Sequence, residues 1–406
     1  MRKKAALGII LLCGAAMLAQ GCSDMEEFRN YIQEETHTYE PEMPKLEETS
    51  TEPLTQGQQE EEEGQHSGEV SALYYAYHCL DEEKQKLYRE MLDAMTGMES
   101  DVRLSTVDKS VLEQVFSCVM NDHPELFYVE GYQYTEYTFG STTTSITFSG
   151  TYSMTKEQVQ QTGALIDQKI EECFRQMPEE EDEYGTVKYL YEWLINQTEY
   201  DKNVENNQNI CSVFLQGRSV CQGYAKAMQY MLQRAQIQCL VVTGFTNGER
   251  HGWNLVRVNG AYYYLDPTWG DASYASGTAD GAAEGFFPSI NYDYFLVTTD
   301  ELTRTHSFEM VVELPQCTEI KDNYFVREGL YFESYDEDRL ALIFGSEAAH
   351  AAGYVTLKCS SSECYARMVQ NLIEEQKIFQ YITRQGSSIA YTSNEKQRTI
   401  SFWNIY

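Results

Sequence analysis

Basic residues, prolines and long apolar runs are all scarce in this sequence. Its 406 residues include 30 Lys and Arg against 63 Asp and Glu, which gives a formal net charge of −33. Because no positive field is available to neutralise phosphates, we expect no nucleic-acid partner. The same deficit excludes a basic surface patch as the means of attachment to anionic lipid. The 11 cysteines are too few for a disulfide scaffold in a chain of this length.

The sequence also lacks an internal repeat and a phosphate-binding loop of the Gly-rich Lys-Ser/Thr kind. It does have a 42% hydrophobic composition with 31 tyrosines, against only 8 prolines. A chain of this length can bury a sizeable core and is expected to form two or three domains. The composition therefore predicts a folded, aromatic-rich body with a separate acidic segment.

The amino terminus has the pattern of an export signal. A basic start at residues 2–4 precedes an apolar run at 5–19, which is shorter than the ~20 residues that a membrane span needs. The run ends in Leu18-Ala19-Gln20-Gly21-Cys22, which resembles a bacterial lipobox. We therefore predict a lipoprotein signal peptide at 1–21 and a membrane-anchoring lipid on Cys22. An ordinary cleaved signal and an uncleaved anchor are the alternatives.

Residues 22–69 are predicted to form an acidic, disordered tether. Between Ser23 and Glu69 the sequence has 15 acidic residues, 2 basic residues and three of the 8 prolines. Such a segment cannot bury enough apolar surface to order itself, and its like charges repel one another. The tether accounts for less than half of the net charge, so the body of the protein is acidic as well.

The body is predicted to have an α+β fold in three parts. These are a small α+β amino-terminal domain at 70–153, a core domain at 154–305 and a small α+β carboxy-terminal domain at 306–406. Apolar spacing predicts helices at 70–98, 106–120, 155–177, 185–197 and 362–379. Runs rich in β-branched and aromatic residues predict strands at 125–137, 142–152, 354–359, 388–392 and 399–403.

Cys221 lies at the predicted start of a further helix. The residues that follow place Tyr224, Met228 and Leu232 on one apolar face. A cysteine in the first turn of a helix has its thiolate stabilised by the helix dipole. The free backbone N–H groups at the same end can bind an oxyanion. These are the two requirements of a nucleophilic cysteine, and a buried structural thiol is the alternative.

A β-hairpin is predicted downstream of this helix. Segments 251–258 and 261–266 read as strands, and Asn259-Gly260 between them is a strong two-residue turn. A two-residue loop fixes the register, so Asp266 should lie opposite Trp253.

This register brings together an imidazole and a carboxylate. His251, Trp253 and Asp266 share one face of the hairpin because side chains alternate along a strand. Asp266 lies diagonal to His251, about 7–8 Å away between backbone positions, which is within side-chain reach. A carboxylate-held imidazole can take the proton of a thiol. Taken alone, the pair could be a surface His–Asp contact, and the upstream cysteine favours the catalytic alternative.

The same residues carry a family resemblance. The segments 220–225 (VCQGYA), 251–254 (HGWN) and 264–269 (YLDPTW) resemble the three motifs of the bacterial transglutaminase-like superfamily. The resemblance covers roughly 185–300 and implies a papain-like α+β fold for the core. It also implies that Cys221 is the nucleophile, His251 the base and Asp266 the carboxylate that orients the base.

Several other residues are weaker candidates. Trp253 and Trp269 are predicted to line a substrate cleft, with packing in the core as the alternative. Gln216 is a candidate oxyanion donor, although a role in the loop is favoured. His123, His306 and His350 are predicted to be structural or exposed. No cofactor or metal is predicted, because Cys359 and Cys364 lack histidines at metal-ligand spacing.

The predicted function is a surface-anchored thiol acyl-transfer enzyme of the cell envelope, held by its lipid at the extracytoplasmic face of the membrane. It would form a thioester with protein or peptide substrates. Water as acceptor gives a peptidase or amidase, and a primary amine gives a crosslinking transglutaminase. The alternatives are a non-catalytic binding or scaffold module, and a protein whose amino-terminal domain does the binding.

Overall fold

The structure, a computed structural model, describes residues 8–11, 72–139, 141–178, 182–271, 289–382, 389–403 and 405. The chain divides into two units, Met1–Cys22 together with Ala72–Tyr406, and Ser23–Ser71. Cys22, the predicted tether and most of the predicted signal peptide therefore lie outside the described residues.

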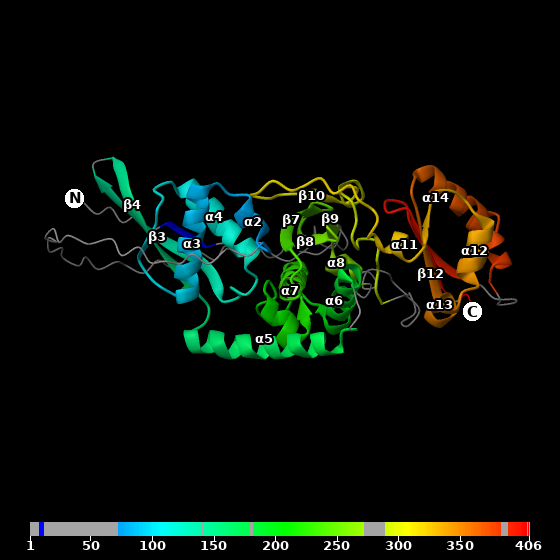
Figure 1. Ribbon diagram of the computed structural model, residues 1–406, viewed down its shortest axis with the longest axis horizontal. Coiled ribbons are helices and arrows are strands. Elements are labelled where there is room, and N and C mark those ends of the chain that lie inside the picture. Colours follow the sequence, from blue (N-terminus) through cyan, green and yellow to red (C-terminus); the bar gives the residue numbers. More distant parts are fainter. Residues whose placement is uncertain are drawn as a thin grey trace, which may run out of the picture. The chain divides into compact units, whose positions relative to one another are not determined.

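The first part of the body combines helices with an antiparallel sheet (Figure 1). In chain order its elements are α2 (Tyr75–His78), α3 (Glu82–Gly97), β2 (Val102–Arg103), α4 (Lys109–Asp122), β3 (Val129–Phe139) and β4 (Thr142–Tyr152). The helix predicted over 70–98 is interrupted, because Asp81 caps α3 by accepting a hydrogen bond from the backbone N–H of Lys84.

One edge of this sheet is β1 (Gly8–Leu11), which pairs antiparallel with β3, and the strand order is β1-β3-β4-β2. β1 lies in the apolar run predicted to belong to the signal peptide. Cleavage of that peptide stays a prediction.

The core combines helices with a second four-stranded sheet (Figure 1). The long α5 (Lys156–Gln176) has Thr155 as its N-cap, as predicted, and Thr155 forms a capping box with Gln158. It is followed by α6 (Glu183–Gln197), β5 (Glu199–Tyr200), the π-helix η1 (Ser212–Gln216), β6 (Arg218–Ser219), α7 (Cys221–Arg234), β7 (Cys239–Thr246), β8 (Glu249–Val258), β9 (Ala261–Leu265), α8 (Pro267–Gly270), α10 (Thr299–Leu302) and β10 (His306–Phe308).

The predicted hairpin is confirmed in its register. Val258 pairs with Ala261 and Asn254 with Leu265, around a turn in which Asn259 and Gly260 both have positive φ. Two successive residues with positive φ are what a type I′ turn requires, and this turn matches the twist of the strands. The sequence Asn-Gly therefore positions the two strands that carry the site.

The core sheet extends past the predicted boundary between residues 305 and 306. β10 begins at His306 and pairs antiparallel with β7, so the core sheet has the order β10-β7-β8-β9. A methyl group at Gly244 of β7 would come within 2.8 Å of the Trp253 ring and would also contact the Ser307 carbonyl. The absence of a side chain there lets β10 lie against the sheet.

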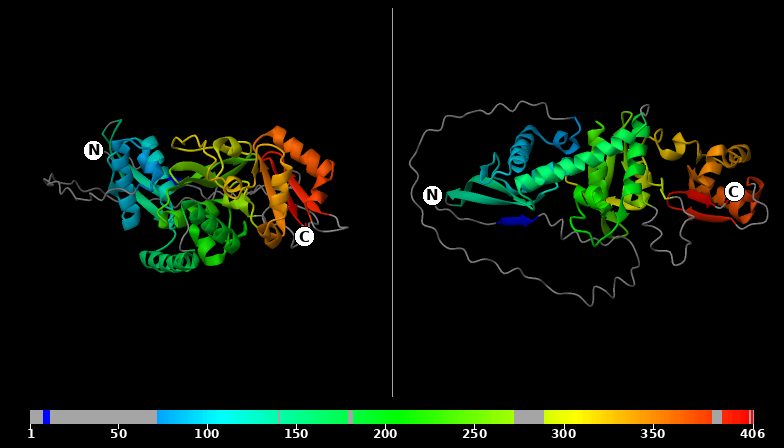
Figure 2. Two further views of the ribbon diagram at one scale, coloured as in Figure 1. Left: turned by 45° about the vertical axis from the view of Figure 1, so that its right-hand side comes forward. Right: turned by 90° about the horizontal axis from the view of Figure 1, so that it is seen from below.

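The last part of the chain forms a third sheet with the order β11-β12-β14-β13. Its elements are α11 (Tyr324–Arg327), β11 (Tyr331–Phe332), α12 (Glu337–Phe344), α13 (Glu347–Ala352), β12 (Tyr354–Cys359), α14 (Ser362–Val369), the π-helix η2 (Gln370–Glu374), the 3₁₀ helix η3 (Lys377–Gln380), β13 (Ala390–Asn394) and β14 (Thr399–Trp403). Figure 2 shows its helices (orange) against its last strands, β13 and β14 (red). Leu340, Leu357 and Phe402 lie in a shared apolar core. The helix predicted over 362–379 is divided into three helical types.

Together these elements confirm a mixed helix and strand fold, as the α+β prediction requires. The separation of the body into independent flanking domains stays a prediction, since residues 72–406 fall in one compact unit.

Candidate active site

Cys221 is the first residue of α7, as predicted, and is half-buried. The face of α7 that carries Tyr224, Met228 and Leu232 is fully buried. No side chain caps α7 at its first turn. The N-cap residue of α7, Val220, therefore offers no side-chain acceptor to the first backbone N–H groups of the helix.

Two glycines allow the chain to pack closely around Cys221. A methyl group at Gly223 would contact Ser219 Oγ and lie 2.8 Å from the Asn207 carbonyl oxygen. A methyl group at Gly252 would lie 2.8 Å from Oε1 of Gln222, the residue after the cysteine. The lack of a side chain at Gly252 lets the strand that carries His251 approach the helix start, and Gly223 lets the preceding segment pack against the first turn.

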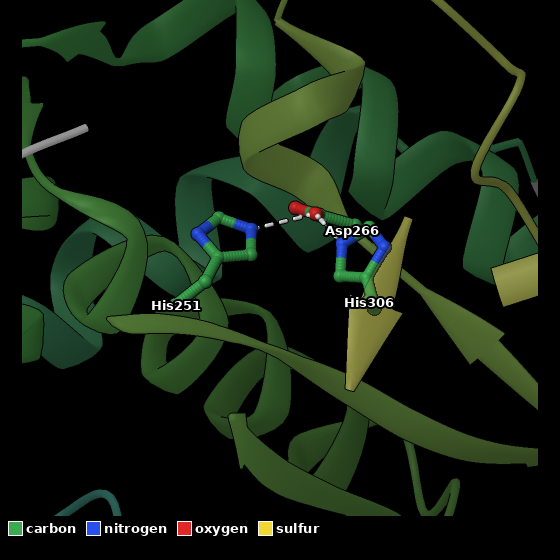
Figure 3. Close-up of side chains that lie close together, drawn as sticks. All are labelled: His251, Asp266 and His306. Carbon is green, nitrogen blue, oxygen red and sulfur yellow. Dashed lines mark hydrogen bonds and ion pairs between the residues drawn. The ribbon is translucent and has the colours of Figure 1, made fainter. Parts of the chain in front are cut away.

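His251 and Asp266 form a buried hydrogen-bonded pair (Figure 3). The Nε2 of His251, on β8, donates to Oδ2 of Asp266 at 2.7 Å. The other carboxylate oxygen, Oδ1, accepts hydrogen bonds from the backbone N–H groups of Thr268 at 2.9 Å and Trp269 at 3.1 Å. Asp266 thus caps the short helix α8 and holds the imidazole at the same time.

The electrostatics of this pair favour its charged form. Burial alone would lower the pKa of His251, but the charge and hydrogen bond of Asp266, together with interactions with Cys221, raise it well above its ordinary value. Burial alone would raise the pKa of Asp266, but the His251 charge and the hydrogen bonds from its imidazole partners hold it well below its usual range. Asp266 therefore stays ionised, and His251 is suited to accept a proton.

The thiol of Cys221 completes the arrangement. Hydrogen bonding to Cys221 is one of the influences that raise the pKa of His251, and Nε2 of the ring is engaged by Asp266. Nδ1 is accordingly the ring nitrogen that the Asp266 bond leaves available. The structure pairs His251 with Asp266, and Cys221 is among the groups that shift the pKa of His251. The catalytic role of the three residues stays a prediction.

Comparison with known proteins agrees with the motifs. Residues 173–267, which hold all three site residues, match the family model of the transglutaminase-like superfamily. The chain contains a transglutaminase-like domain. This confirms the resemblance found in the sequence.

Relatives of known sequence or structure match smaller shares of the chain. It is similar to kyphoscoliosis peptidase of Mus musculus, with 26% identity over 127 residues, covering 27% of this chain and 18% of the relative. A transglutaminase crystal structure aligns at 16% identity and a TM-score of 0.26, covering 38% of this chain and 47% of that one. A putative cysteine protease from Cytophaga hutchinsonii aligns at 15% identity and a TM-score of 0.23, covering 33% of this chain and 61% of that one. The chain thus spans less than a fifth of the length of the peptidase it matches.

The candidate site also holds a second imidazole, whose place there the sequence did not predict. His306, predicted to be structural or exposed, is buried, and its Nε2 lies 3.2 Å from Oδ2 of Asp266 (Figure 3). It belongs to β10, at the opposite end of the strand order from β9. No local spacing rule links it to the aspartate 40 residues earlier, so only the pairing of β10 with β7 could have identified it.

The two tryptophans differ in their exposure. Trp253 is fully buried beneath the imidazoles, with its ring stacked 5.9 Å from that of His251, so it lies in the core and not on a cleft wall. Trp269 is half-buried, with its ring 6.0 Å from that of His251 and 4.8 Å from that of Tyr294. Trp269 remains the tryptophan that a substrate could contact.

The side chain of Gln216 donates to the Glu205 carbonyl oxygen at 3.3 Å, a contact within the loop.

His251, Asp266 and His306 have potential metal-ligand atoms within 4.8 Å of one another. The distances of 2.7 and 3.2 Å to Asp266 Oδ2 fall in the hydrogen-bond range.

Proposed function

We propose that this protein is a thiol acyl-transfer enzyme, a peptidase or amidase or a transglutaminase, which uses Cys221, His251 and Asp266. The observation that carries the proposal is the buried 2.7 Å bond between His251 and Asp266, placed against a cysteine at an uncapped helix start. A structural thiol would need neither feature. The transglutaminase-like domain is consistent with this chemistry.

The proposed first step is acylation. His251 takes the thiol proton, Cys221 Sγ attacks the carbonyl carbon of an amide, and the oxyanion that forms is bound by the first N–H groups of α7. The C–N bond then breaks, and the leaving amine receives its proton from the His251 imidazolium. The product is a thioester on Cys221 and a free amine.

The second step returns the cysteine. With His251 as the base, water attacks the thioester and releases a carboxylic acid, or a primary amine attacks and forms a new amide. The same three residues serve both outcomes, so the acceptor decides between hydrolysis and crosslinking. We propose protein or peptide in the cell envelope as the substrate class, because the sequence predicts an export signal.

A thiol-labelling experiment tests the proposal. At neutral pH and low iodoacetamide, we expect the wild type to be labelled at Cys221, and the label to be lost in Cys221→Ala and strongly reduced in His251→Ala. Cys79→Ala is the matched control, because Cys79 is an exposed free thiol outside the site, and its loss should leave labelling of Cys221 unchanged. An inert Cys221 in the folded wild type would favour the non-catalytic binding module instead.

Membrane attachment through Cys22 is proposed on the lipobox alone. Among the helices that the structure describes, none is long and apolar enough to cross a bilayer. We expect Cys22→Ala to release the protein from membranes or to block its processing, as followed by fractionation. Membrane retention of the variant equal to that of the wild type would contradict a lipid at this residue.

A further inference from the structure

His306 occupies a position that the three proposed catalytic residues do not explain. Its Nε2 lies 3.2 Å from Asp266 Oδ2, the same oxygen that receives His251 at 2.7 Å (Figure 3). A carboxylate oxygen can only accept hydrogen bonds, so both imidazoles donate to it. With Thr268 and Trp269 on Oδ1, the carboxylate has four donors in all.

The orientation of the His306 ring is fixed on its other side as well. Its Nδ1 lies 2.8 Å from the hydroxyl of Thr305. The ring centroid lies 4.9 Å from that of Trp253, 4.8 Å from that of Trp269 and 5.3 Å from that of Tyr294. The imidazole is therefore held by two polar contacts within an aromatic enclosure.

His306 does not contact a substrate, since its side chain has no exposed surface. The titratable groups that face it are Asp266, His251 and Tyr294. Burial lowers the pKa of His306, against the opposing influence of Asp266. At neutral pH the ring is accordingly a neutral donor, and its effect on the site passes through Asp266.

We propose that His306 is a positioning residue: by donating to Asp266 Oδ2, it holds the carboxylate in place and shares its negative charge between two imidazoles. The consequence is a limit on how strongly Asp266 stabilises the His251 imidazolium. An imidazolium held too strongly would be a poor acid for the leaving amine. The positioning of Asp266 by His306 does not depend on acyl transfer. Its effect on the reaction rate rests on the proposed function.

The test is a pH titration of His251, followed by NMR in protein labelled with ¹⁵N-histidine and assigned with the help of His251→Gln. In His306→Phe, which keeps an aromatic ring in the enclosure but removes the donor, we expect the His251 titration to move to higher pH by about one unit. In His306→Gln, whose amide can donate to Oδ2, the titration should stay near that of the wild type. His350→Gln, at an exposed histidine on α13, is the control for histidine loss.

A second variant guards against a folding defect. Thr305→Val removes the hydroxyl at Nδ1 and keeps the shape of the side chain, so it should move the His251 titration in the same direction by a smaller amount. If His306→Phe is folded and titrates as the wild type does, or if Phe and Gln give the same shift, the proposal is overturned. If His306→Phe does not fold, an unshifted Thr305→Val overturns it.

The pH dependence of iodoacetamide alkylation at Cys221 links the two proposals. Its upper inflection reports loss of the proton from the His251 imidazolium, and it should move upward in His306→Phe by the same amount as the NMR titration. If wild-type Cys221 is unreactive while the NMR titrations still separate Phe from Gln, acyl transfer fails and the role of His306 stands. If iodoacetamide alkylates Cys221 in all variants and the upper inflection lies at the same pH in each, acyl transfer stands and the role of His306 fails.

Discussion

At the scale of single residues, packing around Cys221 depends on glycines, whose lack of a side chain allows close contact. Gly223 lies in the first turn of α7, where the helix passes closest to Asn207 and Ser219. Gly163 lies within α5, and a methyl group there would meet nothing within 4 Å. Substitution by alanine therefore adds a methyl group to a crowded site at Gly223 and to an open one at Gly163.

We expect Gly223→Ala to lower the free energy of unfolding by about 1–3 kcal/mol, because the new methyl group must displace Ser219 or the Asn207 backbone. It should also reduce labelling of Cys221, two residues away. Gly163→Ala should raise the free energy of unfolding by about 0.5–1 kcal/mol, since alanine has the higher helix propensity. Urea unfolding of both variants measures the difference, and equal effects would contradict this account of Gly223.

Asp122 gives stability a pH dependence of known sign. Its buried carboxylate accepts hydrogen bonds from the backbone N–H groups of Ala76 and Tyr77 and from the Tyr88 hydroxyl. Burial outweighs these bonds and raises the pKa of Asp122 to about 6. Folding therefore takes up a proton at Asp122 between pH ~4, its unfolded value, and pH ~6.

The contribution of Asp122 to the free energy of unfolding is consequently full below about pH 4 and falls by roughly 3 kcal/mol as pH rises to about 6. Asp122→Asn cannot titrate, so the variant should lack this part of the slope. The measurement is the difference in unfolding free energy between wild type and variant across this window, in which the other carboxylates cancel. A difference that does not vary with pH would show that the shift is absent.

At the scale of helices and strands, the sequence predicted features that depend on a few neighbouring residues, such as turns and helix caps. The Asn259-Gly260 turn fixed the register that brings His251 and Asp266 to one face, and Thr155 marked the start of α5. Pairing between distant segments left no such signal. β10 joins β7 across some 60 residues, so neither the extent of the core sheet nor the role of His306 could be predicted.

The segment that presents His306 is itself anchored by a distant element. Glu301, in α10, forms an ion pair with Lys358 of β12 at 3.1 Å, and both side chains are buried or nearly so. Lys358 also donates to the Gln397 carbonyl oxygen at 3.1 Å. The third sheet thus supplies the cation that balances a carboxylate five residues before the second imidazole.

Lys358→Met should therefore destabilise the protein by about 3–5 kcal/mol, because it leaves the Glu301 carboxylate buried without its cation. The matched control is Lys169→Met, which breaks an exposed pair with Glu172 and should change stability by less than about 1 kcal/mol. Chemical denaturation midpoints compare the two. Similar small losses in both variants would mean that the buried pair contributes little.

At the scale of the whole molecule, the dominant property is a net charge of −33. Repulsion among like charges opposes the compact state, and its range falls from about 30 Å at 0.01 M salt to about 8 Å at 0.15 M. Cys221, the proposed nucleophile, lies within this negative field, yet His251 and Asp266 beside it are buried and hydrogen-bonded. Salt should therefore act on the fold more than on the site.

We expect the unfolding temperature to rise as NaCl is increased from about 0.01 to 0.15 M at pH 8, because screening weakens the repulsion. At pH 5, close to the isoelectric point of about 4.5, the same addition should have a smaller effect. Thermal unfolding followed by circular dichroism at the two pH values tests this. A salt effect of equal size at both would attribute it to something other than net charge.

The turn that sets the site also limits its chemical lifetime. Asn259 is exposed and is followed by Gly260, a pair in which the glycine N–H can attack the asparagine amide and form a succinimide. Opening of that ring to isoaspartate would insert one backbone carbon into the two-residue loop that sets the register of β8 and β9. The Asn259 amide donates to Asp322 Oδ1 at 3.0 Å, and this bond restrains the group that must rotate. Ageing of the protein would then appear as a loss of alignment between His251 and Asp266 long before the fold itself is lost.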